Sequence, residues 1–207
     1  MQFLQQVDVG LFRLIHDTLS NGCFDWLMPL ASGTPGFVPM VLLVAAALLI
    51  WGGARGRVFV VVLGLAILVT DSFLCNTLKH LIARPRPFLT LADVVTLVGR
   101  GGSGSMPSSH AANWAAAAFT TFLFYRRSLW FMVPLAFLVS FSRVYNGVHY
   151  PSDVVVGWVV GAGGAAFAAV AAQGMWQTLG PTLAPRFYER MPSLLVPVPQ
   201  TPKRDAC

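Results

Sequence analysis

The segment SRVYNGVHYPSD, residues 142–153, places an arginine, a histidine and an aspartate together between two apolar stretches. Arg143 suits an anionic oxygen, because its guanidinium offers a planar fork of N–H donors. Pro151 suits the first position of a helix, which leaves Asp153 in the first turn and His149 just outside it. From there Asp153 is close enough to accept the ring N–H of His149. An aspartate that fixes the tautomer in this way makes the other ring nitrogen a nucleophile.

Two earlier segments also carry residues that suit an anion. KHLIARPRP, residues 79–87, contains Lys79 and Arg86, and PSSH, residues 107–110, opens an alanine-rich stretch. Ser108 is placed to cap the helix that follows, and the free N–H groups of its first turn would point at an anion. One lysine and two arginines together form a cluster that suits a tetrahedral oxyanion such as phosphate.

The elements that must position these residues are membrane-spanning helices. The 207 residues are 56% hydrophobic and 11% charged, whereas a soluble domain carries about 25% charged residues. Each span needs about 20 apolar residues, so we predict an all-α, polytopic membrane bundle of five to six transmembrane helices. The sixth depends on whether residues 22–33 enter the membrane separately, because Gly33, Pro35 and Gly36 break the first span. The predicted spans are 25–51, 58–80, 110–125, 129–145 and 152–173.

The two ends of the chain differ from this transmembrane domain, residues 22–173. In residues 1–21, apolar side chains recur at steps of three and four residues, with polar ones such as Asp8 elsewhere, which predicts an amphipathic interfacial helix. Residues 174–207 are rich in proline, and we predict a mostly extended tail.

Counting the spans places the connections 80–109 and 144–151 on one face of the membrane. The turns at residues 55–57 and 126–127, together with the tail, then lie on the opposite face. This topology uses no motif, yet it brings most of the polar residues described above to one membrane surface. They are Lys79, Arg86, His110, Arg143, His149 and Asp153.

These three segments resemble the signature of the type 2 phosphatidic acid phosphatase superfamily. The first motif, a lysine followed after six residues by Arg-Pro, is matched by Lys79, Arg86 and Pro87. The second, Pro-Ser-Gly-His, is matched by residues 107–110 with one departure, and the third is matched completely within residues 142–153. All three occur in the family's order, which makes the resemblance specific.

The resemblance implies how phosphate is held. Lys79, Arg86 and Arg143 would bind the phosphoryl oxygens. The hydroxyl of Ser108 and the backbone N–H of Ser109 would assist them. Ser109 is the departure, since it stands where the family usually has glycine. Its N–H is still available, so we expect activity to be retained.

The resemblance also implies the reaction. His149 would attack phosphorus and form a phosphohistidine, while Asp153 orients the ring. His110 would protonate the leaving group and then activate the water that hydrolyses the intermediate. Arg84 and Arg100 are candidates for contacts to a second phosphate, which favours undecaprenyl (polyprenyl) diphosphate as the substrate. The carboxylate of Asp71 lies deeper in the second span, where we expect a structural role and hydrogen bonds to neighbouring helices.

The sequence predicts no cofactor and no metal. Magnesium prefers several carboxylate oxygens, and the site offers one, already committed to His149. Cys23, Cys75 and Cys207 form no CxxC pattern, so we expect neither a disulfide framework nor a zinc site. The expected partners are a membrane lipid substrate and the bilayer, with no nucleic acid.

Other functions stay open at this point. The substrate could instead be phosphatidylglycerophosphate or lipid A 1-phosphate, or another lipid could replace water as acceptor in a phosphotransferase. A non-catalytic lipid transporter or scaffold is a different class, and such a protein could lose the two histidines that this chain keeps. Basic residues at 55–57, 126–127 and in the tail mark the cytoplasmic side. We therefore expect a bacterial inner membrane protein with its site facing the periplasm or exterior.

Overall fold

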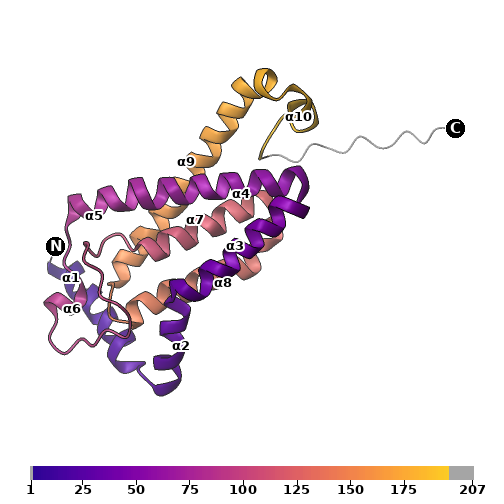
Figure 1. The fold of residues 1–207 in the computed structure, drawn as a ribbon. Helices are drawn as coiled ribbons and strands as arrows, with labels where there is room; N and C mark the ends of the chain where they lie inside the picture. The colour runs from indigo at the N-terminus through magenta and orange to yellow at the C-terminus, as the bar shows by residue number, and fades with distance from the viewer. Residues whose placement is uncertain (1, 196–207) are drawn as a thin grey trace.

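The computed structural model describes residues 2–195, apart from the side chains of residues 2 and 34–36. Every regular element in this range is helical, as the all-α prediction requires (Figure 1). The elements are α1 (Gln2–Arg13), the π-helical η1 (Leu14–Thr18), α2 (Gly22–Ser32), α3 (Thr34–Trp51), α4 (Gly53–Ile67), the π-helical η2 (Leu68–Cys75), α5 (Asn76–Ile82), α6 (Pro87–Thr90), α7 (Ser109–Phe124), the 3-10 turn η3 (Arg126–Ser128), α8 (Leu129–Tyr145), α9 (Pro151–Leu183) and α10 (Pro185–Arg190).

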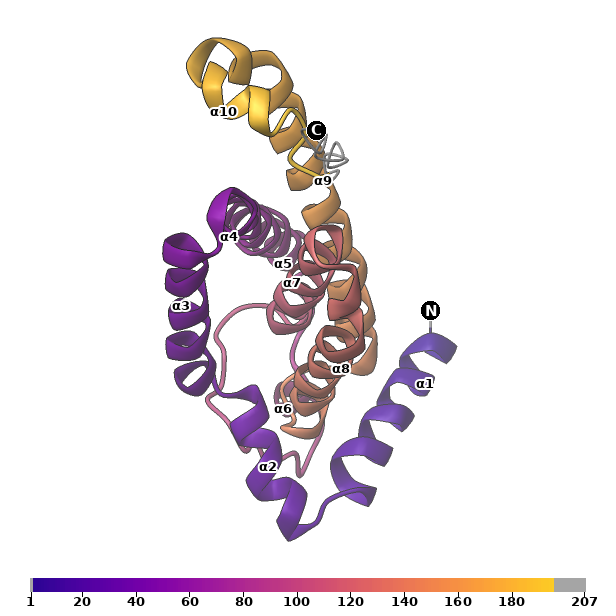
Figure 2. The same cartoon turned by 90° about the vertical axis from the view of Figure 1, so that its right-hand side faces the viewer.

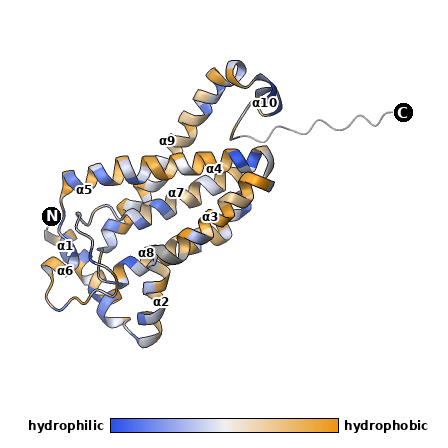
Figure 3. Cartoon of the chain, viewed as in Figure 1, coloured by the Kyte–Doolittle hydropathy of each residue, from blue (hydrophilic) through white to orange (hydrophobic). Residues whose placement is uncertain are grey.

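Long apolar helices make this chain an integral membrane protein (Figure 3). Within the described residues, three helical stretches are long and apolar enough to span a bilayer: Gly53–Thr90, Arg126–Tyr145 and Pro151–Leu183. A fourth span would combine Gly22–Ser32 with Phe37–Trp51, two helices bent by 45° at their junction. Helix α7 has only 16 residues, about 24 Å at 1.5 Å per residue. Five to six spans therefore stay a prediction.

Helix α7 packs closely against α9, and this contact positions the second and third motifs. A Cβ atom at Gly161 would lie 2.1 Å from the carbonyl oxygen of Ala112, and one at Gly157 would lie 2.7 Å from that of Ser108. Only glycine fits at such distances, and small residues are what let membrane helices approach closely. Figure 2 shows α7 and α9 side by side, with α8 next to them.

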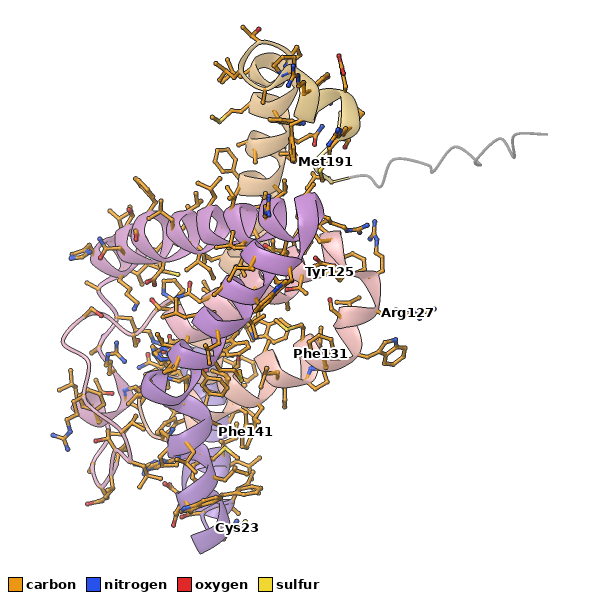
Figure 4. All side chains as sticks on the ribbon, turned by 45° about the vertical axis from the view of Figure 1, so that its right-hand side comes forward. Cys23, Tyr125, Arg127, Phe131, Phe141 and Met191 are labelled. Atoms are coloured by element: carbon orange, nitrogen blue, oxygen red, sulfur yellow. The ribbon has the colours of Figure 1, made fainter. Side chains whose placement is uncertain are left out.

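The connections separate to the two ends of the bundle as the topology predicts. One end holds α6, α1, the first turn of α7 and the start of α9, so the connections 83–108 and 146–150 lie there (Figure 1). The turn between α7 and α8 lies at the opposite end, where Figure 4 labels Tyr125 and Arg127. The polar segments of the three motifs are therefore neighbours.

Helix α1 presents an apolar face outward and a polar residue inward. Leu4, Val7 and Leu11 are exposed, whereas Asp8 and Phe12 are buried. The predicted helix is thus present from Gln2 to Arg13, with the amphipathic pattern that the sequence indicates. An outward apolar face suits lipid, and the interfacial location itself stays a prediction.

The predicted extended tail is wrong for the described part of the C-terminal region. Helix α9 continues to Leu183 instead of ending near residue 173, and α10 follows. Pro181 is accommodated inside α9 near its end, and Pro185 occupies the first turn of α10, where no backbone N–H is needed. Trp176 then packs against Phe187, with ring centroids 5.5 Å apart. Residues 196–207, including Cys207, lie outside the described residues.

Candidate active site

The first and third motifs meet at the buried guanidinium of Arg86. This guanidinium donates a hydrogen bond of 3.1 Å to the carbonyl oxygen of Val148 and lies 3.4 Å from Nε2 of His149. Its Nε also donates to the carbonyl oxygen of Ser103 at 2.9 Å. Gly101 is needed beside it, because a Cβ there would lie 2.8 Å from the guanidinium. The glycine-rich loop 99–105 thus wraps Arg86.

Hydrogen bonds join the second motif to the first and to the third. The backbone N–H of Ser108 donates to the carbonyl oxygen of Asp153 at 3.0 Å. Nζ of Lys79 donates to Oγ of Ser109 at 2.8 Å. These two contacts fix the N-terminus of α7 between the end of α5 and the start of α9. The hydroxyl at position 109, where glycine was expected, therefore has Lys79 as its hydrogen-bond partner.

His149 and Asp153 lie next to each other, but Nδ1 of His149 makes no hydrogen bond within residues 2–195, so the predicted bond to the carboxylate stays a prediction. Nδ1 of His149 lies 3.5 Å from Oδ2 of Asp153, and both residues are buried. The same carboxylate oxygen accepts the backbone N–H of Tyr150 at 2.8 Å. Arg86 offers only N–H donors, so Nε2 beside it must carry the lone pair and Nδ1 the proton. Burial lowers the pKa of His149 to about 4, which leaves the ring neutral at pH 7.

Ser108 corrects one prediction. It stands at the N-cap position of α7, but its side chain makes no capping hydrogen bond. Its buried Oγ has no partner among residues 2–195, so the hydroxyl is available to a ligand. In the first turn of the same helix, His110 is half-buried and interacts electrostatically with Arg143 and His149. Arg143 is buried and donates to the hydroxyl of Ser32.

Hydrogen bonds to two carboxylates occupy both arms of the Arg84 guanidinium, and its contact to a second phosphate stays a prediction. One arm of its guanidinium donates to Asp153 at 2.7 Å, and the other donates to Asp8 at 2.6 Å. The cation also lies 4.1 Å from the ring centroid of Tyr150. Two carboxylates and an aromatic ring therefore hold Arg84 beside Asp153.

Arg100 is not brought to the cluster. Its Nε donates to Thr96 at 3.3 Å, and its guanidinium lies 5.4 Å from the ring centroid of Phe88. Both contacts are within the connection that follows α5, and Arg100 is exposed.

Comparison with known proteins identifies the family to which these three motifs belong. The model of the PAP2 superfamily matches residues 57–177, a range that contains all three motifs. This chain belongs to the PAP2 superfamily. The resemblance drawn from the motifs is confirmed, and the chain is a membrane lipid phosphatase of this superfamily.

Individual relatives carry different substrate names. A lipid A 4'-phosphatase of Bacteroides thetaiotaomicron is 35% identical over 171 residues, which cover 78% of this chain and 75% of that protein. The undecaprenyl-diphosphatase BcrC of Bacillus subtilis is 29% identical over 154 residues, covering 72% and 76%. The crystal structure of LpxE from Aquifex aeolicus has a TM-score of 0.65 and 26% identity, covering 77% of this chain and 93% of that one.

Sequence reasoning missed the part that α1 plays in this PAP2 site. Asp8 accepts the backbone N–H of Ser152 at 2.9 Å and its hydroxyl at 2.6 Å, in addition to the bond from Arg84. The available signal was a lone carboxylate between two valines in an otherwise amphipathic helix. Periodicity identified the helix, but it could not say which partner the carboxylate would meet.

A polar pocket of about 370 Å³ adjoins the phosphate-binding residues. Lys79 and Ser109 form one side of it, and Asp71, Ser72, Asn76 and Ser103 line the remainder. The expected hydrogen bonds from Asp71 to neighbouring helices are not made: no side chain within residues 2–195 donates to its carboxylate. The residue that the sequence assigned to structure therefore lies in a cavity.

Proposed function

We propose that this PAP2 enzyme hydrolyses a lipid phosphate through a phosphohistidine formed on Nε2 of His149. The observation that carries the proposal is the neutral His149 ring between Asp153 and Arg86, with its lone pair turned toward the phosphate-binding side. Nε2 would attack phosphorus as the bond from phosphorus to the lipid oxygen breaks. His110 would give its proton to that oxygen. Water then attacks the phosphohistidine, His110 takes a proton from it, and phosphate leaves.

Five groups are proposed to hold the phosphoryl oxygens. Lys79, Arg86 and Arg143 provide positive charge in a largely buried setting, where such charge-assisted bonds are strong. The unpartnered hydroxyl of Ser108 and the backbone N–H of Ser109 complete the set. The helix N-terminus of α7 adds its dipole. Basic side chains thereby take the part that metal ions take in other phosphatases, and no cofactor enters this mechanism.

For the substrate, the proposal is a lipid phosphate monoester. The earlier preference for undecaprenyl diphosphate rested on Arg84 and Arg100, and both side chains have other hydrogen-bond partners. Polyprenyl diphosphate stays as the second candidate, because relatives such as BcrC of Bacillus subtilis carry that substrate in their names. Water is the proposed acceptor, since the mechanism needs no second lipid.

The proposed location is a bacterial inner membrane, with the site toward the periplasm or exterior. At the opposite end of the bundle, Arg55 in the first turn of α4 donates to the carbonyl oxygen of Phe124, the last residue of α7, and Arg126 and Arg127 follow in η3. Positive charge marks the cytoplasmic side. A cysteine introduced near residue 100 should therefore react with an impermeant reagent from outside intact cells, whereas one near residue 55 should not. The reverse labelling pattern would overturn the orientation.

The test of the function is phosphate release by the purified protein in detergent. The lipids are phosphatidic acid, phosphatidylglycerophosphate, lipid A and undecaprenyl diphosphate, each assayed with EDTA present. Activity should survive EDTA, and rapid quenching with phosphate-labelled lipid should trap an acid-labile phosphoenzyme that His149→Ala does not form. Dependence on magnesium, or a phosphoenzyme that persists in His149→Ala, would overturn the proposal.

A further inference from the structure

The pocket beside the phosphate cluster has a polar side that the proposed mechanism does not use. Asp71, Ser72, Asn76 and Ser103 line it together with Lys79 and Ser109, which belong to the proposed phosphate-binding groups. Its volume of about 370 Å³ falls within the range of small-molecule sites, about 300–1,000 Å³. Lys79 is thus shared by this pocket and by the proposed phosphate-binding groups.

The π-helical segment η2 is what brings Asp71 into this pocket. At the end of η2 the backbone N–H of Asn76 donates to the carbonyl oxygen of Asp71, five residues earlier. Residues five apart then lie on one side of the helix. In a regular α-helix Asp71 would point about 80° away from Lys79, because eight residues at 3.6 per turn do not close a whole number of turns. The widened turn removes this offset, and such π segments are frequent at functional sites.

The carboxylate of Asp71 accepts no hydrogen bond from a described side chain. It belongs to the apolar stretch Gly53–Thr90. It interacts electrostatically with Lys79 and with Cys75. Cys75 lies between the two charged residues along the helix. An ionisable residue in a membrane span is costly, and its usual reason is function.

We propose that Asp71, Ser72 and Asn76 bind hydroxyl groups of the lipid's leaving head group, next to the phosphate held by Lys79. This inference rests on the proposed function, since it assigns the substrate class of the same site. A carboxylate accepts O–H and N–H donors, and an amide and a hydroxyl both donate and accept. A second phosphate would instead meet the negative charge of Asp71. The pocket therefore selects a hydroxyl-bearing phosphate monoester over a lipid diphosphate.

Two kinds of head group present this chemistry, a sugar and a glycerol. In lipid A the phosphate is attached to a glucosamine ring with neighbouring oxygen and amide groups. In phosphatidylglycerophosphate it is attached to a glycerol with one free hydroxyl. Phosphatidic acid serves as the reference, because its leaving group has no free hydroxyl. Undecaprenyl diphosphate serves as the opposite case, because its leaving group is an anion.

The experiment compares Asp71→Asn with the parent enzyme on these four lipids in mixed micelles. Loss of one charge-assisted hydrogen bond should raise KM for the hydroxyl-bearing substrate about 10-fold. KM for phosphatidic acid should change by less than about 2-fold, and KM for undecaprenyl diphosphate should fall, because a repulsion is removed. A larger effect on lipid A than on phosphatidylglycerophosphate identifies the sugar, and the converse identifies the glycerol.

A matched control is Asp93→Asn, which removes one negative charge at an exposed position in the connection after α5. Its backbone has φ of +63°, a conformation that asparagine also adopts readily. The control should leave the ratio of KM values unchanged. Equal KM changes on all four lipids in Asp71→Asn, or no change on any, would overturn the inference. Trapping of the phosphoenzyme separately reports whether the proposed function holds, so the two failures are distinguishable.

Discussion

Oδ2 of Asp8 lies 2.6 Å from Nη2 of Arg84, so the N-terminal helix is linked through one guanidinium to Asp153, the aspartate proposed to orient His149. The other arm of Arg84 donates to Asp153. Two buried carboxylates, Asp8 and Asp153, therefore share one cation. The negative charge of Asp8 offsets part of the effect that the positive charge of Arg84 has on Asp153. Asp153 retains enough negative charge to orient His149, while Arg84 offsets the cost of burying it.

Removing Asp8 tests this arrangement. In Asp8→Asn, Asp153 is the one carboxylate left bonded to the guanidinium of Arg84, so less negative charge faces His149. We expect kcat to fall about 10-fold with little change in KM, and the acidic limb of the pH profile to move to lower pH. A merely structural role would lower the amount of active enzyme without moving that limb. The matched control, Asp17→Asn, removes an exposed carboxylate that pairs with Arg13 at 3.1 Å.

The pH profile of the parent enzyme should reflect the buried nucleophile. The pKa of His149 is lowered from its ordinary value to about 4 by burial, although Asp153 opposes the shift. A lowered pKa keeps the ring neutral above about pH 4, so attack on phosphorus needs no deprotonation step at pH 7. We expect kcat/KM to persist as pH falls from 7 to about 5 and to decline near pH 4. An acidic limb near pH 6.5, the ordinary value of histidine, would contradict this burial.

The contact between α7 and α9 should be sensitive to one methyl group. Gly161→Ala introduces a Cβ that would lie 2.1 Å from the carbonyl oxygen of Ala112, so the helices must separate. Overpacking of this kind costs about 1–3 kcal/mol, and the separation moves Asp153 away from Ser108. We expect a lower Tm in detergent and a lower kcat. Gly163→Ala is the control, because nothing lies within 4 Å of its added Cβ; equal losses in both variants would contradict the packing argument.

The sequence predicted the site better than it predicted the fold around it. Motif spacing and a count of spans brought His149, Asp153 and Arg86 to one end of the bundle, because connections between antiparallel helices alternate between the two ends. The partner of Arg84 was not accessible in this way, since it depends on how α1 packs against α9. The depth of Asp71 could be read from the sequence, but its place in a pocket could not, because the π-helical geometry of η2 has no sequence signal.

His110→Ala separates the two candidate substrate classes by their leaving groups. Attack by His149 on a lipid monophosphate expels an alkoxide, which needs a proton, whereas attack on a lipid diphosphate expels a phosphate monoester, which is a stable anion. General acid help is worth about 10²–10⁴-fold. His110→Ala should therefore slow phosphoenzyme formation severely with phosphatidic acid or lipid A, and only mildly with undecaprenyl diphosphate.

The measurement must follow the first step alone, because His110 is also proposed to activate the water that hydrolyses the phosphohistidine. Rapid quenching of the labelled phosphoenzyme isolates that step, and His149→Ala supplies the blank. Steady-state rates would combine protonation of the leaving oxygen with activation of water. They would therefore not report the difference between the two lipid classes in the first step. If His110→Ala slows phosphoenzyme formation equally for both lipid classes, this histidine does not protonate the leaving oxygen, and its effect must come from binding or from the later hydrolysis.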